Sequence, residues 1–311
     1  MSKLLLKIRN AVGSAAGFIG DRKWFLAKLA GYAAVLAVFY GMFLWLLFPY
    51  NELMAMVSER IKDTTSMDVS VRKAGGAFPL GLKLEDVVIT EKAGTVESPV
   101  LEARTIELVP GILSLFRGRL AVKVYASLYN GAVWMDAWDR GSTFDLSGEI
   151  RDVDVGRYSL IKSRYGLHIE GALSAKFDVE GDRDNVTKDT GKVDITMKHA
   201  RLDPSSLFGI FALPGMDFGT IDLPVFIHKG RVVFQDATQT GKDMNSKLSG
   251  MIVLVNQIDD SVLNLKLSFN PTPALEQRIR KAMPIFTLNR DTTGYFNLPV
   301  TGTLHRPRLA L

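Results

Sequence analysis

Side chains suited to metal binding or nucleophilic catalysis are few and widely spaced in this sequence. Cysteine is absent, and the four histidines, His168, His199, His228 and His305, show neither His-x-x-x-His nor His-Glu-x-x-His spacing. Histidines four residues apart on a helix are a usual zinc signature, and a thiolate is needed for an iron–sulfur cluster or a cysteine nucleophile. We therefore expect solvated histidines, no metal site and no cofactor.

Motifs of hydrolases and nucleotide-binding enzymes are also missing. The sequence contains no Gly-x-Ser-x-Gly, no phosphate-binding loop and no Gly-x-Gly-x-x-Gly. Three pairs of acids fall among turn residues: Asp152 and Asp154, Asp182 and Asp184, Asp259 and Asp260. Turns capped by their own side chains account for such pairs, and Arg183 argues against calcium in the loop 181–185. These observations predict a protein that is not an enzyme.

One stretch of the sequence is suited to crossing a membrane. Residues 29–48 carry no charged side chain, and about 20 apolar residues span a bilayer as a helix. Six bases and a single acid, Asp21, precede this stretch: Lys3, Lys7, Arg9, Arg22, Lys23 and Lys28. Because the basic flank of an anchor stays in the cytoplasm, we expect a cytoplasmic tail at 1–23 and a transmembrane helix at 24–48. Trp24, Trp45 and Tyr50 would mark the ends of this anchor.

A cleaved signal peptide is the alternative explanation of this stretch. It requires an apolar region of about 7–15 residues and a cleavage site between small residues. Here the run is longer and ends in aromatic residues, which suit the membrane interface. We therefore expect an inner-membrane protein with a single span and with residues 49–311 in the periplasm.

Beyond residue 67 the apolar residues recur at every second position. The clearest alternation covers 120–129, 173–180, 193–198 and 263–269, and weaker alternation covers 80–90, 142–150, 221–228, 245–255 and 294–304. Turn pairs such as Asn130-Gly131 and Lys229-Gly230 separate these runs. The pattern is typical of half-buried antiparallel strands and predicts a mainly β domain over 67–311.

Helices are expected at only three places in the exported part. An amphipathic helix at 51–64, within the segment 49–66, begins at Asn51 as N-cap and places Leu53, Val57 and Ile61 on one face. Shorter helices are expected at 156–163 and 273–283. Because these helices cannot cover ten or more strands, either two sheets pack face to face or one sheet curls around an apolar trough.

Two places depart from the alternating pattern. The segment 204–220 is interrupted by glycine and proline and carries seven large apolar residues: Leu207, Phe208, Ile210, Phe211, Leu213, Met216 and Phe218. It is either a short helix and turn folded over one end of the sheet, or an apolar flap over a groove or partner surface. Similarly, Trp134 and Trp138 form either a cross-strand packing pair or an exposed contact patch.

The net charge of +5 comes mostly from the N-terminal tail, so the exported part is close to neutral. It contains no basic patch with interleaved aromatic residues. An exported domain of this kind is not expected to bind nucleic acid.

The order of motifs resembles one protein family. GGAFPLGLKLEDV at residues 75–87, after an anchor and an amphipathic helix, is similar to the N-terminal region of the type II secretion system protein N family in its deltaproteobacterial, AsmA-like form. LPVTGTLHRPRL at residues 298–309 resembles the terminal hairpin of AsmA-like proteins, and GLHIEGAL at 166–173 is a looser match. The long basic tail departs from the family, whose members usually start close to the anchor.

The resemblance implies a curled β-sheet with an apolar groove and a role at the inner membrane. The expected function is a non-enzymatic accessory or structural component of type II secretion, with other secretion components, the bilayer and a lipid in the groove as partners. The alternative is an AsmA-like lipid-handling protein that works independently of secretion.

The predicted topology can be tested with single cysteines at Ser14 and Ser127. A thiol reagent that cannot cross the inner membrane, applied from outside, is expected to label position 127 and leave position 14 unlabelled. The reverse pattern, or an N-terminus processed near residue 50, would contradict the anchor.

Overall fold

A computed structural model provides the structure of this chain. It describes residues 28–33, 35–36, 38–43, 46–64, 67–77, 81–93, 96–111, 114, 118–207, 211–282 and 290–309. Contacts between Cα atoms divide the chain into two units, Met1–Pro49 and Tyr50–Leu311. Each unit is described by itself.

The first unit is helical wherever it is described before residue 48. Among the described residues, no helix combines the length and the apolar character that crossing a bilayer requires. The predicted anchor at 24–48 lies in part outside the described residues, as do Trp24 and Trp45. The transmembrane helix therefore stays a prediction.

The second unit consists mostly of strands. Its helical elements are α2 (Tyr50–Thr64), η1 (Val155–Arg157), α4 (Ser159–Tyr165), η2 (Val186–Lys188), η3 (Ile258–Asp260) and α5 (Pro273–Ala282). Its first eight strands are β1 (Met67–Ala77), β2 (Gly81–Ala93), β3 (Val96–Pro110), β4 (Leu120–Leu128), β5 (Gly131–Asp139), β6 (Thr143–Asp154), β7 (Ile169–Asp182) and β8 (Thr190–Leu202). The remaining strands are β9 (Ser205–Leu207), β10 (Phe211–Leu213), β11 (Met216–His228), β12 (Arg231–Thr240), β13 (Met244–Val253), β14 (Val262–Pro271), β15 (Phe296–Thr303) and β16 (Pro307–Leu309).

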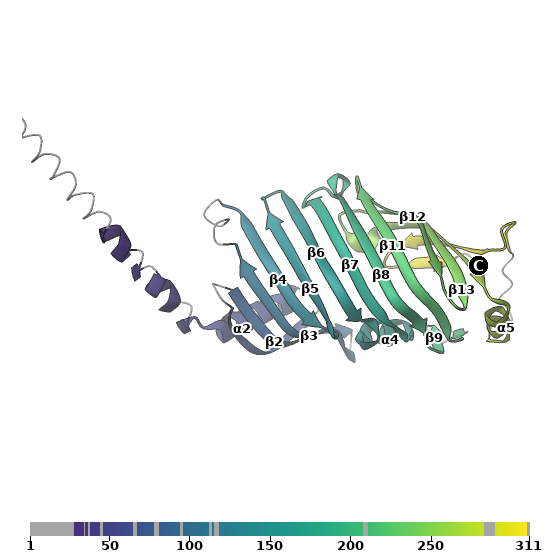
Figure 1. Cartoon of the computed structure of the whole chain (residues 1–311), viewed down its shortest axis with the longest axis horizontal. Coiled ribbons are helices and arrows are strands. Elements are labelled where there is room, and N and C mark those ends of the chain that lie inside the picture. The colour runs from purple at the N-terminus through teal and green to yellow at the C-terminus, as the bar shows by residue number, and fades with distance from the viewer. Residues whose placement is uncertain are drawn as a thin grey trace, which may run out of the picture. The chain divides into compact units, whose positions relative to one another are not determined.

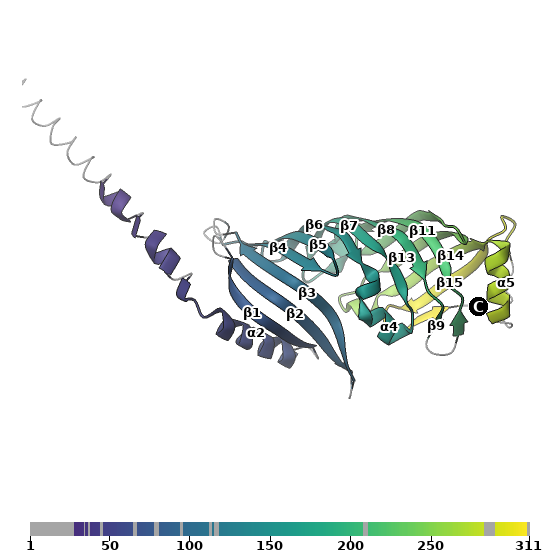
Figure 2. The same ribbon diagram turned by 60° about the horizontal axis from the view of Figure 1, so that its bottom comes forward.

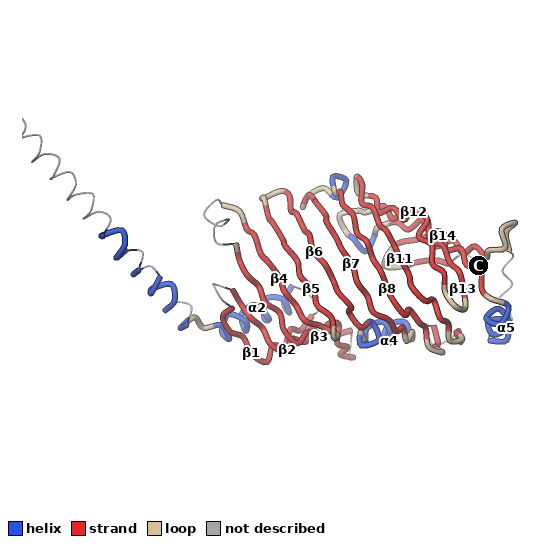
Figure 3. The backbone as a smooth tube through the Cα atoms, viewed as in Figure 1, coloured by secondary structure: helices blue, strands red, loops and turns tan. Residues whose placement is uncertain are grey.

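Within the described part of the chain, fourteen strands form one antiparallel sheet in the order of the sequence (Figures 1 and 3). Only β9 and β10 leave this order, because they pair with each other as a separate hairpin between β8 and β11. Sequential neighbours are the simplest consequence of short connections, which let each strand fold back on the one before. The predicted mainly β, antiparallel domain with few helices is confirmed.

The sheet is strongly twisted. Figure 2 shows β1–β3 from their broad side and β6–β8 nearly from the edge, and in both views β14 and β15 run across the direction of β4–β8 (Figures 1 and 2). Such turning follows from the right-handed twist that accumulates from strand to strand.

The strand and helix predictions from the sequence agree closely with these elements. Strands occupy every run in which alternation was noted. The helices expected at 51–64 and 273–283 are present as α2 and α5. The helix expected at 156–163 is divided into η1 and α4, because Tyr158 between them has an extended backbone.

The face of α2 that packs against the sheet differs from the predicted one. Met54 is buried, whereas Leu53 and Val57 are 36% and 38% exposed. Asn51 lies inside the helix and not at its N-cap, and its side-chain oxygen accepts the backbone N–H of Ala74 in the edge strand β1. This hydrogen bond connects the first turn of α2 to β1, and Met54 on the same helix meets the sheet.

Met54 joins a core cluster with three residues of β2 and β3: Leu84, Val87 and Ala103. Truncation of a buried methionine removes its packing and leaves a cavity, so Met54→Ala is expected to lower the free energy of unfolding by about 2–5 kcal/mol. Met56 on the same helix is 69% exposed, and Met56→Ala is expected to change it by less than about 0.5 kcal/mol. Denaturant unfolding of the full chain measures both; equal losses would contradict the packing of α2.

Candidate functional site

One face of the sheet is apolar from the first strands to the last. In antiparallel strands, residues directly opposite one another project from the same face. One row of such partners crosses thirteen strands and contains only apolar residues and glycine: Gly76, Leu82, Leu108, Val124, Met135, Gly148, Phe177, Val193, Val225, Phe234, Gly250, Leu265 and Val300. We call this set the apolar row.

A second row of the same kind lies two residues further along the strands. It runs through Pro110, Val122, Ala137, Leu146, Val179, Gly191, Ile227, Val232, Ile252, Leu263 and Gly302. The two rows together make a continuous apolar surface across the domain, which we call the apolar face.

The apolar face is only partly covered. In the apolar row Val225 is buried, while its other members are of intermediate exposure. α2 covers the end formed by β1–β4, where Met54 packs among residues of these strands. Val122, Val124 and Phe177, which the sequence placed on the apolar side, therefore lie on that side but are not enclosed as they would be in a close-packed core.

Gly148 shows how this face is fitted together locally. It lies opposite Phe177, and a Cβ atom at Gly148 would come within 2.6 Å of the Phe177 ring. Because Gly148 has no side chain, the Phe177 ring can lie over the neighbouring strand at this point.

The opposite face of the sheet carries charged and aromatic residues. One row on this face reads Lys83, Glu107, Tyr125, Trp134, Glu149, Lys176 and Asp194. The sheet is therefore amphipathic as a whole, with one face suited to water and the other suited to apolar material.

The two tryptophans of β5 lie on the charged face. The Arg151 guanidinium stacks over Trp134 at 4.1 Å from the ring centroid, and its Nε atom donates to Glu149 at 2.8 Å. This hydrogen bond holds the pKa of Glu149 below its usual value. Trp138 is 43% exposed, so Trp134 is packed across strands whereas Trp138 is open to solvent.

The predicted apolar flap is divided between two structures. Residues 205–207 and 211–213 pair as β9 and β10 where one interpretation expected a helix, and Met216 and Phe218 belong to β11 in the main sheet. Phe208 and Ile210, and the side chains of Leu207 and Phe211, lie outside the described residues. Leu213 ends β10 and is half-buried. Tyr50 is the first residue of α2.

The hairpin is attached to the sheet through polar contacts. Arg278 of α5 donates to the carbonyl of Gly215 and to Asp243, each at 2.9 Å. The other carboxylate oxygen of Asp243 accepts the backbone N–H of Asp217 at 2.9 Å. These contacts fix the short connection between β10 and β11 against α5.

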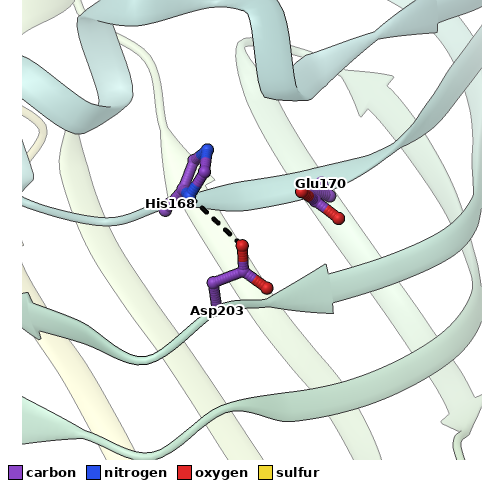
Figure 4. A group of neighbouring side chains, drawn as sticks. All are labelled: His168, Glu170 and Asp203. Atoms are coloured by element: carbon purple, nitrogen blue, oxygen red, sulfur yellow. Dashed lines mark ion pairs between the residues drawn. The ribbon is translucent and has the colours of Figure 1, made fainter.

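A polar cleft of about 1040 Å³ lies at the edge of the sheet where β7 and β11 begin and β8 and β12 end. His168, Glu170 and Asp203 lie together at this end of β7 and β8, and Figure 4 shows the ion pair of His168 with Asp203 and Glu170 beside it. The imidazole Nδ1 of His168 is 3.2 Å from the Asp203 carboxylate, and one ligand atom from each of the three residues lies within 4.8 Å of the others. The sequence analysis did not bring these residues together.

Arg201 links the acidic members of this cluster. Its guanidinium donates to Glu170, and its Nε atom is 3.5 Å from Asp203. The hydrogen bond to Glu170, together with the negative charges of Glu170 and Asp203, raises the pKa of Arg201. The group is thus an ionic network at the strand ends, and its donor set of one imidazole and two carboxylates is also able to hold a metal ion.

The acids at 182–184 serve the turn, as the sequence suggested. Asp182 accepts the backbone N–H groups of Asp184 and Asn185 and pairs with Lys188 Nζ at 2.6 Å. The hydrogen bond from Lys188, followed by that from Asp184, lowers the pKa of Asp182. These partners use the carboxylate that a calcium ion in this loop would need.

Comparison with known proteins identified no matching family model, no matching curated protein and no matching solved structure. The resemblance to type II secretion protein N and to AsmA-like proteins therefore stays a prediction.

The open character of the apolar face can be measured with two phenylalanines. Phe269 is 8% exposed and packs against Phe296 with ring centroids 5.5 Å apart, so Phe269→Ala is expected to cost about 3–5 kcal/mol of unfolding free energy. Phe177 is only partly buried, and Phe177→Ala is expected to cost less than half of this, about 1–2 kcal/mol. Equal losses in denaturant unfolding would show that the row around Phe177 is a closed core.

Proposed function

We propose that this protein is a non-enzymatic accessory component of type II secretion, held at the inner membrane by residues 24–48, whose periplasmic β domain binds apolar material along its apolar face. The observation that carries the proposal is the apolar row, which is continuous across thirteen strands and only partly buried over most of its length. Exposed apolar surfaces of this extent mark sites of ligand or protein binding.

The shape of the surface favours an extended occupant. The strands stand about 4.8 Å apart, so even half of the row offers about 30 Å of apolar surface in one direction. An acyl chain or an extended apolar segment of a partner protein fits such a surface better than a compact polar substrate does. We further propose that the sheet curls around this ligand and forms a groove.

A lipid-handling protein independent of secretion is the second candidate. The same apolar face supports it, because acyl chains need only an uninterrupted apolar surface and no specific polar partner. In this proposal the bilayer is both the place of attachment and the source of the ligand.

The segment 204–220 is proposed to line one end of the apolar face. Its β9–β10 hairpin is held by a separate two-stranded pairing and lies outside the main sheet. Pro204 before β9, and Pro214 and Gly215 after β10, separate this hairpin from β8 and β11. Its apolar side chains would then be available to a lipid or to another secretion component.

Photo-crosslinking in cells tests the proposal with two neighbouring residues of β7. A photoreactive residue at Phe177 faces the apolar side, and one at Lys176 faces the charged side. Capture of lipid or of a secretion protein is expected at 177 and at Phe211 of the hairpin, and none at 176.

The same experiment separates the two candidates when it is repeated in cells that lack the secretion apparatus. Loss of the crosslinked product supports the role in secretion, whereas a lipid product that persists supports lipid handling alone. Equal capture at 176 and 177, or no capture at 177, would contradict binding along the apolar face.

A further inference from the structure

The polar cleft at the strand ends contains a donor set that the proposed function does not use. We propose that His168, Glu170 and Asp203 bind one divalent metal ion, with zinc as the ion that this donor set favours. One imidazole nitrogen and two carboxylate oxygens are a common zinc ligand set, and imidazole selects against calcium and magnesium.

The backbone fixes two of the three ligands relative to each other. The N–H of Asp203 donates to the carbonyl of His168 at 2.9 Å, and the N–H of His168 donates to the Ser205 hydroxyl at 3.1 Å. That hydroxyl donates in turn to the carbonyl of Asp203 at 2.6 Å. The His168 and Asp203 side chains therefore start from a framework that closes the ends of β7, β8 and β9.

The third ligand is set by the strand register. Glu170 lies two residues beyond His168 and directly opposite Arg201, and Arg201 is two residues from Asp203. Residues separated by two along a strand project from the same side, so these side chains meet at one level of the sheet. The ligand atoms lie within 4.8 Å of one another, whereas zinc with bonds of about 2.0–2.2 Å needs them about 3–4 Å apart. Small side-chain rotations, with no change in the backbone, close this difference.

The charge of the cluster is suited to a divalent cation. Arg201 pairs with Glu170 and Asp203, and Asp217 lies opposite Arg201 on the side away from Glu170, where it adds a third carboxylate. These three carboxylates and the one guanidinium together carry a net charge of −2. The neighbouring Arg157 adds no net charge, because it pairs with Asp154 at 3.4 Å.

Other bases of the cleft lie further away. Lys242 follows β12, which is two strands from β8 and thus about 10 Å away at the usual strand spacing. His199 lines the same cleft but is not one of the three converging residues.

Arg201 occupies the place of the cation in this structure and would have to move. It contacts Glu170 and Asp203 and is itself more than half exposed. Its register partner Asp217 offers a second carboxylate. Metal binding would therefore exchange the pairing of Arg201 with Glu170 for pairing with Asp217, and it would connect the ends of β7 and β8 through the metal. The cleft leaves the remaining coordination positions to water.

Zinc titration of the purified full chain, stripped of metal with a chelator and read with a competing fluorescent zinc indicator, tests the site. We expect one saturable site per chain.

His168→Ala is expected to weaken the zinc affinity by about tenfold or more, since loss of a ligand lowers affinity at least as much as the 10–100-fold typical of residues that support a ligand. Arg201→Gln is expected to tighten it by about tenfold, because a competing positive charge is removed from the two carboxylates. His199→Ala is the matched control and is expected to leave the affinity unchanged.

Circular dichroism of each variant shows whether the sheet is intact, and only folded variants are compared. Arg201→Met, which also removes the positive charge, replaces Arg201→Gln if the latter does not fold. Absence of saturable zinc binding in both the parent and the Arg201 variant would overturn the proposal. Binding that His168→Ala leaves unchanged, or that His199→Ala weakens as much as His168→Ala does, would overturn it as well. An Arg201 variant that binds zinc no more tightly than the parent would overturn the displacement of arginine by metal.

Discussion

The register of the strands is the constraint on which the rest of this structure depends. A shift of one residue in any pair would move every side chain of that strand to the other face. Two-residue turns set the register in at least two hairpins. Tyr129 and Asn130 between β4 and β5, and Lys229 and Gly230 between β11 and β12, all have positive φ angles, which is the backbone of a type I′ turn. Tight turns of this type bring apolar residues opposite apolar residues, so each new strand extends the same face.

In the part of the chain that the structure describes, helices cover only some of the apolar face of this amphipathic sheet. α2 covers β1–β4, and α5 packs at the end of β14 and against the hairpin. Strand pairing is limited at the edge formed by β15 and β16. β16 pairs with only three residues of β15, and Arg290 forms a bridge to Phe296. Pro299 of β15 has no backbone N–H to donate. The protein thus limits pairing at this edge, while its apolar face stays only partly buried.

Alternation of apolar residues was sufficient to predict the strands, their antiparallel pairing and the scarcity of helices. It was not sufficient to predict which residues of α2 are buried, because Leu53, Met54 and Val57 are all apolar and the contacts that distinguish them come from distant strands: Met54 packs on β2 and β3, and Asn51 accepts a hydrogen bond from Ala74 of β1. It also could not distinguish a closed sandwich from an open face, since both give the same period of two. The hairpin at 205–213 was missed because strands of three residues are too short to show a period.

The polar cluster escaped the sequence analysis for a different reason. His168 and Glu170 show the spacing of residues on one side of a strand, but Asp203 is more than thirty positions away and joins them only through the pairing of β7 with β8. That pairing is interrupted at Gly171, whose φ of +149° and lack of a side chain let Met197 and the backbone of β8 approach closely. His199 and Gly219 have positive φ angles at the same level of the next two strands, and the register between β8 and β11 shifts there too.

Bulges at one level in three neighbouring strands bend their ends away from the regular sheet, because each bulge adds local twist. The bend carries Glu170, Arg201 and Asp217, which lie opposite one another just beyond the bulges, into the cleft. Without the bulges, the alternation of the sheet would continue to the strand ends. The polar cluster and the apolar face therefore both result from the pairing of consecutive strands. Regular register builds the apolar surface, and shifts of the register gather charged groups at the edge of the sheet.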